Sequence, residues 1–168
     1  FPHINFSISI DGYGKYNDYQ RWGSDFNQVI DNAHILAEQD HAVSFLCVPG
    51  MYNITNLHLL LEFLDDEFPQ TGLYLQINHM EIQSPFNHPN TELVLASLEK
   101  CKKTKTYYAD GRSCKSTIDS LYDYYSNNPQ CDLKLLKEFF IYNDKLDNAR
   151  NVRLADYIPD LEDCRKFI

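Results

Sequence analysis

Polar side chains that could bind or activate a ligand follow three short apolar segments of the chain. Ser9 and Asp11 end the first segment, Asn53 follows the second, and His79 and Glu81 follow the third. Hydroxyl, carboxylate, amide and imidazole groups hold polar ligands by hydrogen bonds, and several of them can also transfer protons. These five residues are therefore the first candidates for a functional site.

A metal site at the third segment is an alternative interpretation. Imidazole and carboxylate groups suit zinc or iron, and His88 follows His79 and Glu81 along the same connection. Their spacing matches no tight metal-binding motif, so a polar loop is the favoured interpretation and no metal site is predicted.

The apolar segments and their flanks predict alternating strands and helices. Strands are expected at 4–10, 42–48 and 73–77. A first helix is expected between them, capped by Ser24 and ending near Gln39-Asp40, and a second, capped by Thr55 or Asn53, with its apolar face at 57–64 before the acidic run 65–67 and Pro69 end it. This order indicates βαβ units and a parallel sheet. In such sheets ligands bind beyond the carboxyl ends of the strands, where the candidate residues lie.

The later part of the chain carries helical patterns at about 91–101, 114–125 and 132–149. The predicted fold class is α/β: residues 1–90 form a parallel βαβαβ half-barrel, the second half of a partial TIM-like barrel, and residues 91–168 form a helical C-terminal extension. Three parallel strands leave both outer edges unpaired. Because a strand also begins within a few residues of Phe1, we expect the chain to be the later part of a longer barrel.

Charge and composition exclude several classes of protein. Residues 1–100 carry 3 basic and 13 acidic side chains, which argues against a binder of nucleic-acid backbones. The short run 102–108 mixes lysines with tyrosines, but it is better explained as a solvated loop. No apolar run is long enough for a membrane helix. Five cysteines without a C-x-x-C pair favour reduced thiols and a cytoplasmic protein.

Several of these segments together resemble radical S-adenosylmethionine enzymes of the SPASM or twitch type. The sequence Ser-Ile-Asp-Gly at 9–12, an arginine at position 21, the strand at 43–48 and a following asparagine match the middle of that family. The stretches 146–150 and 154–161 are similar to its closing L-D-x-x-R and F-P-E-L patterns. The resemblance covers nearly the whole chain.

The resemblance implies roles for four residues in binding S-adenosylmethionine. Ser9 and Arg21 would contact the methionyl end of the cofactor, with Asp11 in the same turn, and Leu75 would lie near the adenine. A guanidinium fork suits a carboxylate, and a hydroxyl at a strand end suits an amino group or a ribose. Without the resemblance, Arg21 would be expected to form a surface ion pair with Asp18 or Asp25.

The family also needs three cysteines at C-x3-C-x2-C spacing to hold a [4Fe–4S] cluster, and this chain has no such triplet. Cys101, Cys114 and Cys131 lack the close pairs expected of ligands to an auxiliary cluster. A missing N-terminal half of the same protein would hold the cluster, so this chain alone is not expected to be active. Its long connection and C-terminal helices would form part of the wall around a small-molecule or peptide substrate.

A second interpretation belongs to another class of protein. The same fold would be complete in itself, would have no iron–sulfur cluster, and would bind a small molecule or a partner at the strand ends. In this interpretation the chain is a non-catalytic α/β binding or interaction module.

Overall fold

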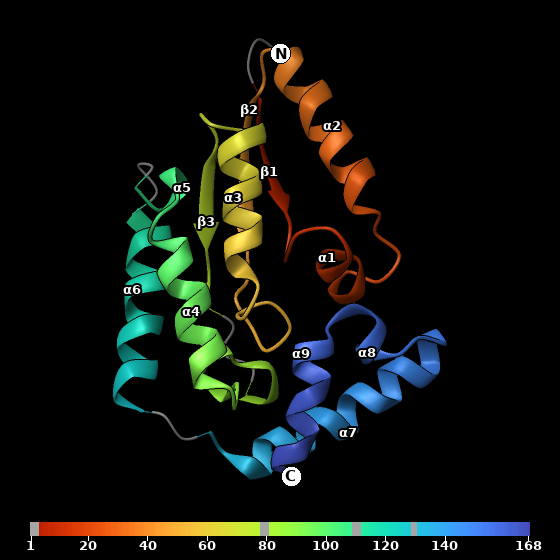
Figure 1. Cartoon of the computed structure of the whole chain (residues 1–168). Helices are drawn as coiled ribbons and strands as arrows, with labels where there is room; N and C mark the ends of the chain where they lie inside the picture. The colour runs from red at the N-terminus through yellow and green to blue at the C-terminus, as the bar shows by residue number, and fades with distance from the viewer. Residues whose placement is uncertain (1–3, 78–80, 109–111, 129–130) are drawn as a thin grey trace.

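A small parallel sheet organises the first half of the chain. The computed structural model describes residues 4–77, 81–108, 112–128 and 131–168. Within them β1 (Asn5–Ser9), β2 (Ala42–Cys47) and β3 (Gly72–Leu75) pair in parallel in the order β1-β2-β3 (Figure 1). The predicted α/β class and the parallel βαβαβ order are confirmed.

Helices make up most of the remaining described chain. They are α1 (Lys15–Gln20), α2 (Phe26–Glu38), α3 (Leu57–Glu67), α4 (Thr91–Cys101), α5 (Lys105–Tyr108), α6 (Arg112–Asn127), α7 (Leu133–Arg150), α8 (Leu154–Tyr157) and α9 (Pro159–Glu162). Short 3-10 turns are η1 (Glu81–Gln83), η2 (Pro85–Asn87) and η3 (Asp163–Phe167). None of the described helices has the length and apolar character that a membrane span requires.

The predicted cap of α2 is wrong, whereas the predicted end of α3 agrees with the structure. Asp25 rather than Ser24 caps α2, because its carboxylate accepts the backbone N–H of Gln28. Helix α3 ends at Glu67, within the acidic run 65–67 and before Pro69, which were predicted to end it.

Helix α1 was not predicted, because its six residues are too few to show a helical period. Two glycines allow the chain to turn into it directly after β1. A Cβ on Gly12 would lie 2.8 Å from Cβ of Tyr16, and Gly14 has φ +54° and ψ −126°, which side chains disfavour. The predicted glycine-rich exit loop is therefore a tight entry into a helix.

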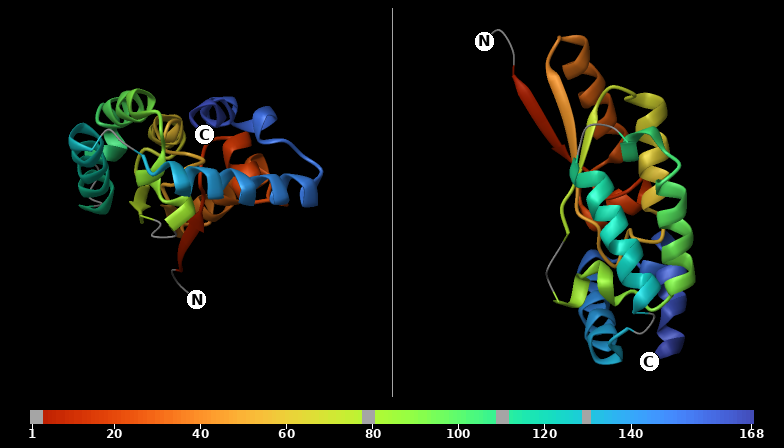
Figure 2. Two further views of the ribbon diagram at one scale, coloured as in Figure 1. Left: turned by 90° about the horizontal axis from the view of Figure 1, so that it is seen from below. Right: turned by 90° about the vertical axis from the view of Figure 1, so that its left-hand side faces the viewer.

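The two faces of the sheet differ in what covers them. Phe45 and Leu73 are at most 2% exposed on the face that packs against the helices. Ser7, Ser9 and Tyr74 are exposed on the opposite face. Figure 2 shows α2, α3 and α4 together on one side of the strands, with no helix of the described chain on the other side. One face of the sheet is thus packed and the other is open and largely polar.

One hydrophobic core lies beside the sheet, and a second lies beyond the carboxyl ends of its strands. The larger one joins the packed face of the sheet to α2, α3, α4 and α6. The smaller one joins α1 and the loop after β2 to the C-terminal helices, and its buried residues include Tyr19, Met51, Phe139 and Leu161. The C-terminal helices therefore pack below the carboxyl ends of the strands, as Figure 1 shows.

The cysteines offer a simple test of this packing. Four of their side chains are at most 1% exposed, whereas Cys131 is partly exposed. Burial raises the pKa of Cys114 and of Cys164 to about 12, so little of either thiol is in the reactive thiolate form at neutral pH. We expect N-ethylmaleimide at pH 7 to label Cys131 first in the native protein, as measured by peptide mass spectrometry. Cys131→Ser should remove the rapid reaction, and rapid labelling of Cys47 would contradict this packing.

Candidate functional site

Asp11 connects the carboxyl ends of β1 and β2. Its Oδ1 accepts the backbone N–H of Val48 at 2.9 Å, and its Oδ2 lies 2.8 Å from Nη2 of Arg21. Its backbone N–H also donates to the side chain of Asn17 at 3.1 Å. The Asp11 side chain is 13% exposed and that of Arg21 is 37% exposed. This ion pair therefore lies at the edge of the core and also holds the end of α1 against the sheet.

Asn53 completes the junction from the loop after β2, and it is fully buried. Its side-chain Oδ1 accepts the N–H of Gly50 at 2.7 Å. Its Nδ2 donates to the carbonyls of Asp11 at 2.9 Å and of Val48 at 3.0 Å. Both ends of the amide are thus used to hold two loops together.

A cleft of about 350 Å³ opens beside this junction. Its walls come from the end of β1, the loop after β2, α1, η1 and α7. The lining residues are Asp11, Tyr19, Gln20, Val48, Gly50, Tyr52, Gln83, Tyr142, Leu146 and Arg150. A cleft of this size is suitable for a small molecule or a single side chain. It lies where parallel α/β sheets bind ligands, at the carboxyl ends of the strands.

A hydrogen-bonded network joins the cleft to the C-terminal helices. The hydroxyl of Tyr19 lies 2.6 Å from Oδ1 of Asp147 and 2.8 Å from Oδ1 of Asn143. The other oxygen of Asp147 accepts the N–H of Leu154 at 2.6 Å. Tyr52 also donates to Asn143, at 3.1 Å. Burial, together with the hydrogen bond to Asp147, raises the pKa of Tyr19, and burial raises that of Tyr52, so both phenols stay protonated and act as donors.

Arg150 is the last residue of α7 and lines the same cleft. Its Nη1 donates to the carbonyl of Tyr19 at 3.1 Å, and its guanidinium carbon lies 5.6 Å from the centre of the Trp22 ring. Asn151 follows in the left-handed conformation and ends the helix. The guanidinium is therefore held at a fixed place between α1 and α7.

Removing the Tyr19 hydroxyl tests how firmly the C-terminal helices are attached. Tyr19→Phe removes the hydroxyl donor from Oδ1 of Asp147, while Oδ2 keeps the N–H of Leu154, so we expect the free energy of unfolding to fall by about 2 kcal/mol. Urea unfolding measures this change. Tyr13→Phe is the matched control, because Tyr13 is 42% exposed and keeps its ring contacts. An equal effect of both substitutions would contradict the assigned role of Tyr19.

The structure brings together Asp11, Arg21 and Asn53 of the predicted site. Ser9 lies on the open face at the end of β1, whereas Leu75 is 4% exposed on the opposite, packed face. The register pairs Leu75 with Cys47 and Ser9 with Leu46, so these two predicted contacts are on different sides of the sheet.

Two further predicted residues belong to the connection after β3. His79 lies outside the described residues, and Glu81 is described only as the first residue of η1. Among the described residues, no group of three or more histidines, cysteines, aspartates or glutamates is placed to hold a metal ion.

Sequence reasoning did not single out Tyr19, Tyr52 or Asn143. Asn143 is a polar residue at a buried position of α7, where the helical pattern otherwise places apolar residues. A polar residue at a position where the helical pattern expects an apolar one was the signal in the sequence for this network. Arg150 was noticed only within the closing pattern, without a role.

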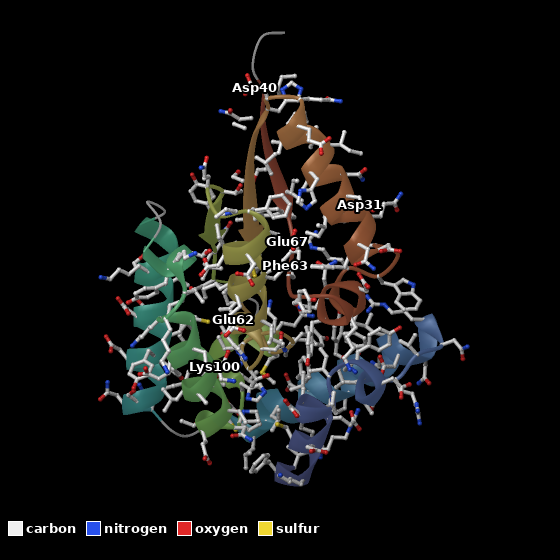
Figure 3. The ribbon with its side chains drawn as sticks, turned by 45° about the horizontal axis from the view of Figure 1, so that its top comes forward. Asp31, Asp40, Glu62, Phe63, Glu67 and Lys100 are labelled. Atoms are coloured by element: carbon white, nitrogen blue, oxygen red, sulfur yellow. The ribbon has the colours of Figure 1, made fainter. Side chains whose placement is uncertain are left out.

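A second polar cluster lies between α3 and α4. Nδ1 of His58 is 3.0 Å from the hydroxyl of Ser97, and Nζ of Lys100 is 3.3 Å from Nε2. Burial lowers the pKa of His58, and the charge of Lys100 lowers it further. Figure 3 labels Lys100 on α4 near Glu62 on α3. A serine nucleophile needs access to substrate and a histidine base that a carboxylate orients. Here Ser97 is buried, and the second ring nitrogen of His58 faces Lys100 instead of a carboxylate. This cluster is therefore a contact between two helices and not a nucleophile with its base.

No family model, curated protein or solved structure matches this chain, so its function has to be argued from its own residues and geometry.

Proposed function

We propose that the chain is the C-terminal half of a radical S-adenosylmethionine enzyme with a partial barrel. In this proposal it supplies part of the cofactor pocket and part of the substrate wall. The observation that carries the proposal is the one-sided sheet, in which sequential parallel strands have their helices on one face (Figure 2). A doubly wound sheet is covered by helices on both faces, whereas a barrel keeps its helices on the outside.

The open face suits the inside of such a barrel. Ser7, Ser9 and Tyr74 are exposed there, and Ser9 and Tyr74, which lie nearer the carboxyl ends of their strands, would line an interior pocket once further strands close around it. No described strand pairs with the outer edge of β1, whereas α6 lies beside β3 and Thr117 donates to the carbonyl of Leu75 at 3.3 Å. The N-terminal half of the same protein would therefore add its strands at the β1 edge.

The residues at the strand ends fit the cofactor in part. Ser9 presents an exposed hydroxyl at the end of β1. Arg21 uses one Nη on Asp11, and its Nε is buried without a partner in the described chain, so the guanidinium has donors left for a carboxylate. Tyr74, and not Leu75, is the β3 residue on the same face of the sheet as Ser9. Ser9 and Arg21 would hold the methionyl end, and Tyr74 would lie closer to the adenine than Leu75.

The radical chemistry itself would be supplied by S-adenosylmethionine and a [4Fe–4S] cluster on the N-terminal half, in the reducing cytoplasm. The described residues would bind and orient the cofactor and the substrate. Asp11 would fix the guanidinium of Arg21, and Asn53 would hold the two loops that shape the pocket. Helix α7 would close the carboxyl end and contact a small-molecule or peptide substrate.

The test begins with the coding sequence upstream of Phe1, where a C-x3-C-x2-C segment is expected. The longer protein, prepared without oxygen and loaded with iron and sulfide, should release 5′-deoxyadenosine from S-adenosylmethionine under reducing conditions. Absence of both the cysteine triplet and this product would overturn the proposal.

A pair of serine variants of the longer protein tests the assigned pocket. Ser9→Ala should raise the KM for S-adenosylmethionine about threefold to tenfold, because one hydrogen bond to the cofactor is lost. Ser7→Ala is the matched control, since it removes the same hydroxyl two residues earlier on the same exposed face. Equal KM values for the two variants would contradict the role of Ser9.

The second candidate function is a self-contained binding module without a cluster. The observation in its favour is that the end of β1, the loop after β2, α1 and α7 already form a cleft of about 350 Å³ at the carboxyl ends of the strands. A start codon directly before Phe1, together with ligand binding by the 168-residue chain, would favour this function over the first.

A further inference from the structure

The charges around the cleft are not balanced. Two of its described lining residues, Asp11 and Arg150, carry formal charges. Asp11 already faces Arg21 at 2.8 Å and accepts the N–H of Val48. Within the described ranges, no carboxylate lies at ion-pair distance from Arg150. The uncompensated charge at the cleft wall is therefore positive, in a chain whose net charge is −9.

The nearest acidic residue along α7 is not at ion-pair distance from Arg150. Asp147 lies one turn earlier, and its two oxygens accept the Tyr19 hydroxyl and the N–H of Leu154. Arg150 uses one Nη on the carbonyl of Tyr19 and stacks near Trp22. A guanidinium has five N–H donors, so most of them are left for a ligand.

We propose that this cleft binds a ligand through an oxyanion, a carboxylate or a phosphate, held by the guanidinium of Arg150. Both groups accept two parallel hydrogen bonds from a guanidinium fork. The rings of Tyr52 and Tyr142 form apolar walls beside it, so the ligand combines an anionic group with an apolar or aromatic body. The site uses only residues of this chain and does not depend on the proposed radical chemistry.

The probes are benzoate and phenyl phosphate, with benzamide as the uncharged analogue. The chain has a single tryptophan, Trp22, close to Arg150, so its fluorescence reports binding at this place. Isothermal titration calorimetry of the 168-residue chain gives the dissociation constants. We expect saturable binding of at least one anion with a dissociation constant below about 10 mM and none of benzamide. Tighter binding of benzoate identifies a carboxylate ligand, and tighter binding of phenyl phosphate identifies a phosphate.

Two arginine variants distinguish a specific anion-binding site from nonspecific electrostatic attraction. Arg150→Gln should raise the dissociation constant at least about tenfold, since it removes the charged fork. Arg153→Gln is the matched control, because it makes the same charge change three residues later, where the side chain is 78% exposed and paired with Asp156. Equal weakening by both variants would overturn the proposal, and so would failure of both anions to bind the unmodified chain.

A third variant covers the case in which Arg150→Gln disturbs the contact with Tyr19 and impairs folding. Leu146→Phe narrows the cleft without changing any charge, because Leu146 lines the cleft one turn before Arg150. We expect it to abolish anion binding while circular dichroism shows a folded chain. Unchanged binding in this variant would place the anion elsewhere and overturn the proposal.

Discussion

Asn53→Ala is expected to lower the free energy of unfolding by about 4 kcal/mol. The side chain is fully buried, and its loss leaves the N–H of Gly50 and the carbonyl of Val48 without their side-chain partner. The carbonyl of Asp11 loses one of two donors and keeps the amide of Gln20. Each buried polar group left unpaired costs about 1–3 kcal/mol, and the loops can relax to recover part of it. Urea unfolding with a constant m-value measures the change.

The matched control for this substitution is Asn32→Ala. Asn32 is exposed on α2, where alanine is a better helix former than asparagine, so we expect a change within about 0.5 kcal/mol. Asp31, the neighbouring residue labelled in Figure 3, is also exposed on this outer surface. A loss of less than about 1 kcal/mol for Asn53→Ala would show that the junction between the two strand ends is not held by this amide.

The location of the junction was predictable because it depends on chain order alone. Alternating strands and helices imply a parallel sheet, and a parallel sheet brings the carboxyl ends of its strands to one edge. That rule placed Asp11 and Asn53 together, and the structure shows the amide of Asn53 bonded to the carbonyl of Asp11. Arg21 lies beside them because helix α1, which it ends, follows directly after the turn that contains Asp11.

The face on which a strand residue points was harder to predict. Side chains alternate between the two faces, so a shift of one residue changes the side of the sheet. Leu75 is the predicted contact for the adenine, but the register with Cys47 places it in the packed core, and its neighbour Tyr74 shares the open face with Ser9. A short apolar strand carries no pattern that tells its two faces apart.

The cleft could not be predicted because its walls are far apart in the sequence. The hydroxyl of Tyr19 meets Asp147, which is 128 residues later, and Arg150 donates to the Tyr19 carbonyl across 131 residues. The local periodicity of apolar residues in the sequence does not indicate such long-range contacts. The smaller core explains them, because the apolar residues of α7 need a surface to cover and α1 with the loop after β2 provides it.

Acidification is expected to destabilise the protein through His88. Its side chain is 1% exposed, its Nδ1 accepts the N–H of Asn90 at 3.3 Å, and its Nε2 has no partner within the described chain. Burial lowers the pKa of His88 to about 4, against about 6.5 in the unfolded chain. The unfolded state therefore binds one more proton than the folded state between these values, so stability falls as the pH decreases from about 6.5 to about 4.

The size of this effect follows from the difference between the two pKa values. The contribution of His88 falls by up to about 1.4 kcal/mol per pH unit and by roughly 3 kcal/mol in total. Urea unfolding at several pH values between 7 and 4.5 should show this slope. His88→Gln should be less stable at pH 7 but should show a flatter slope, and His58→Gln should flatten it independently, because burial lowers the pKa of His58 as well. An unchanged slope in His88→Gln would contradict the assignment.

The structural consequence of protonating His88 can also be located. The backbone N–H of His88 donates to the hydroxyl of Tyr125 at 3.1 Å, and the same hydroxyl donates to the carbonyl of Pro85. This contact holds the segment from η2 to α4 against α6. A charged His88 ring needs water, so the segment should separate from α6 before the sheet unfolds. Hydrogen exchange at pH 4.5 should therefore increase first at the amides of residues 85–90, while the amides of β2 stay protected.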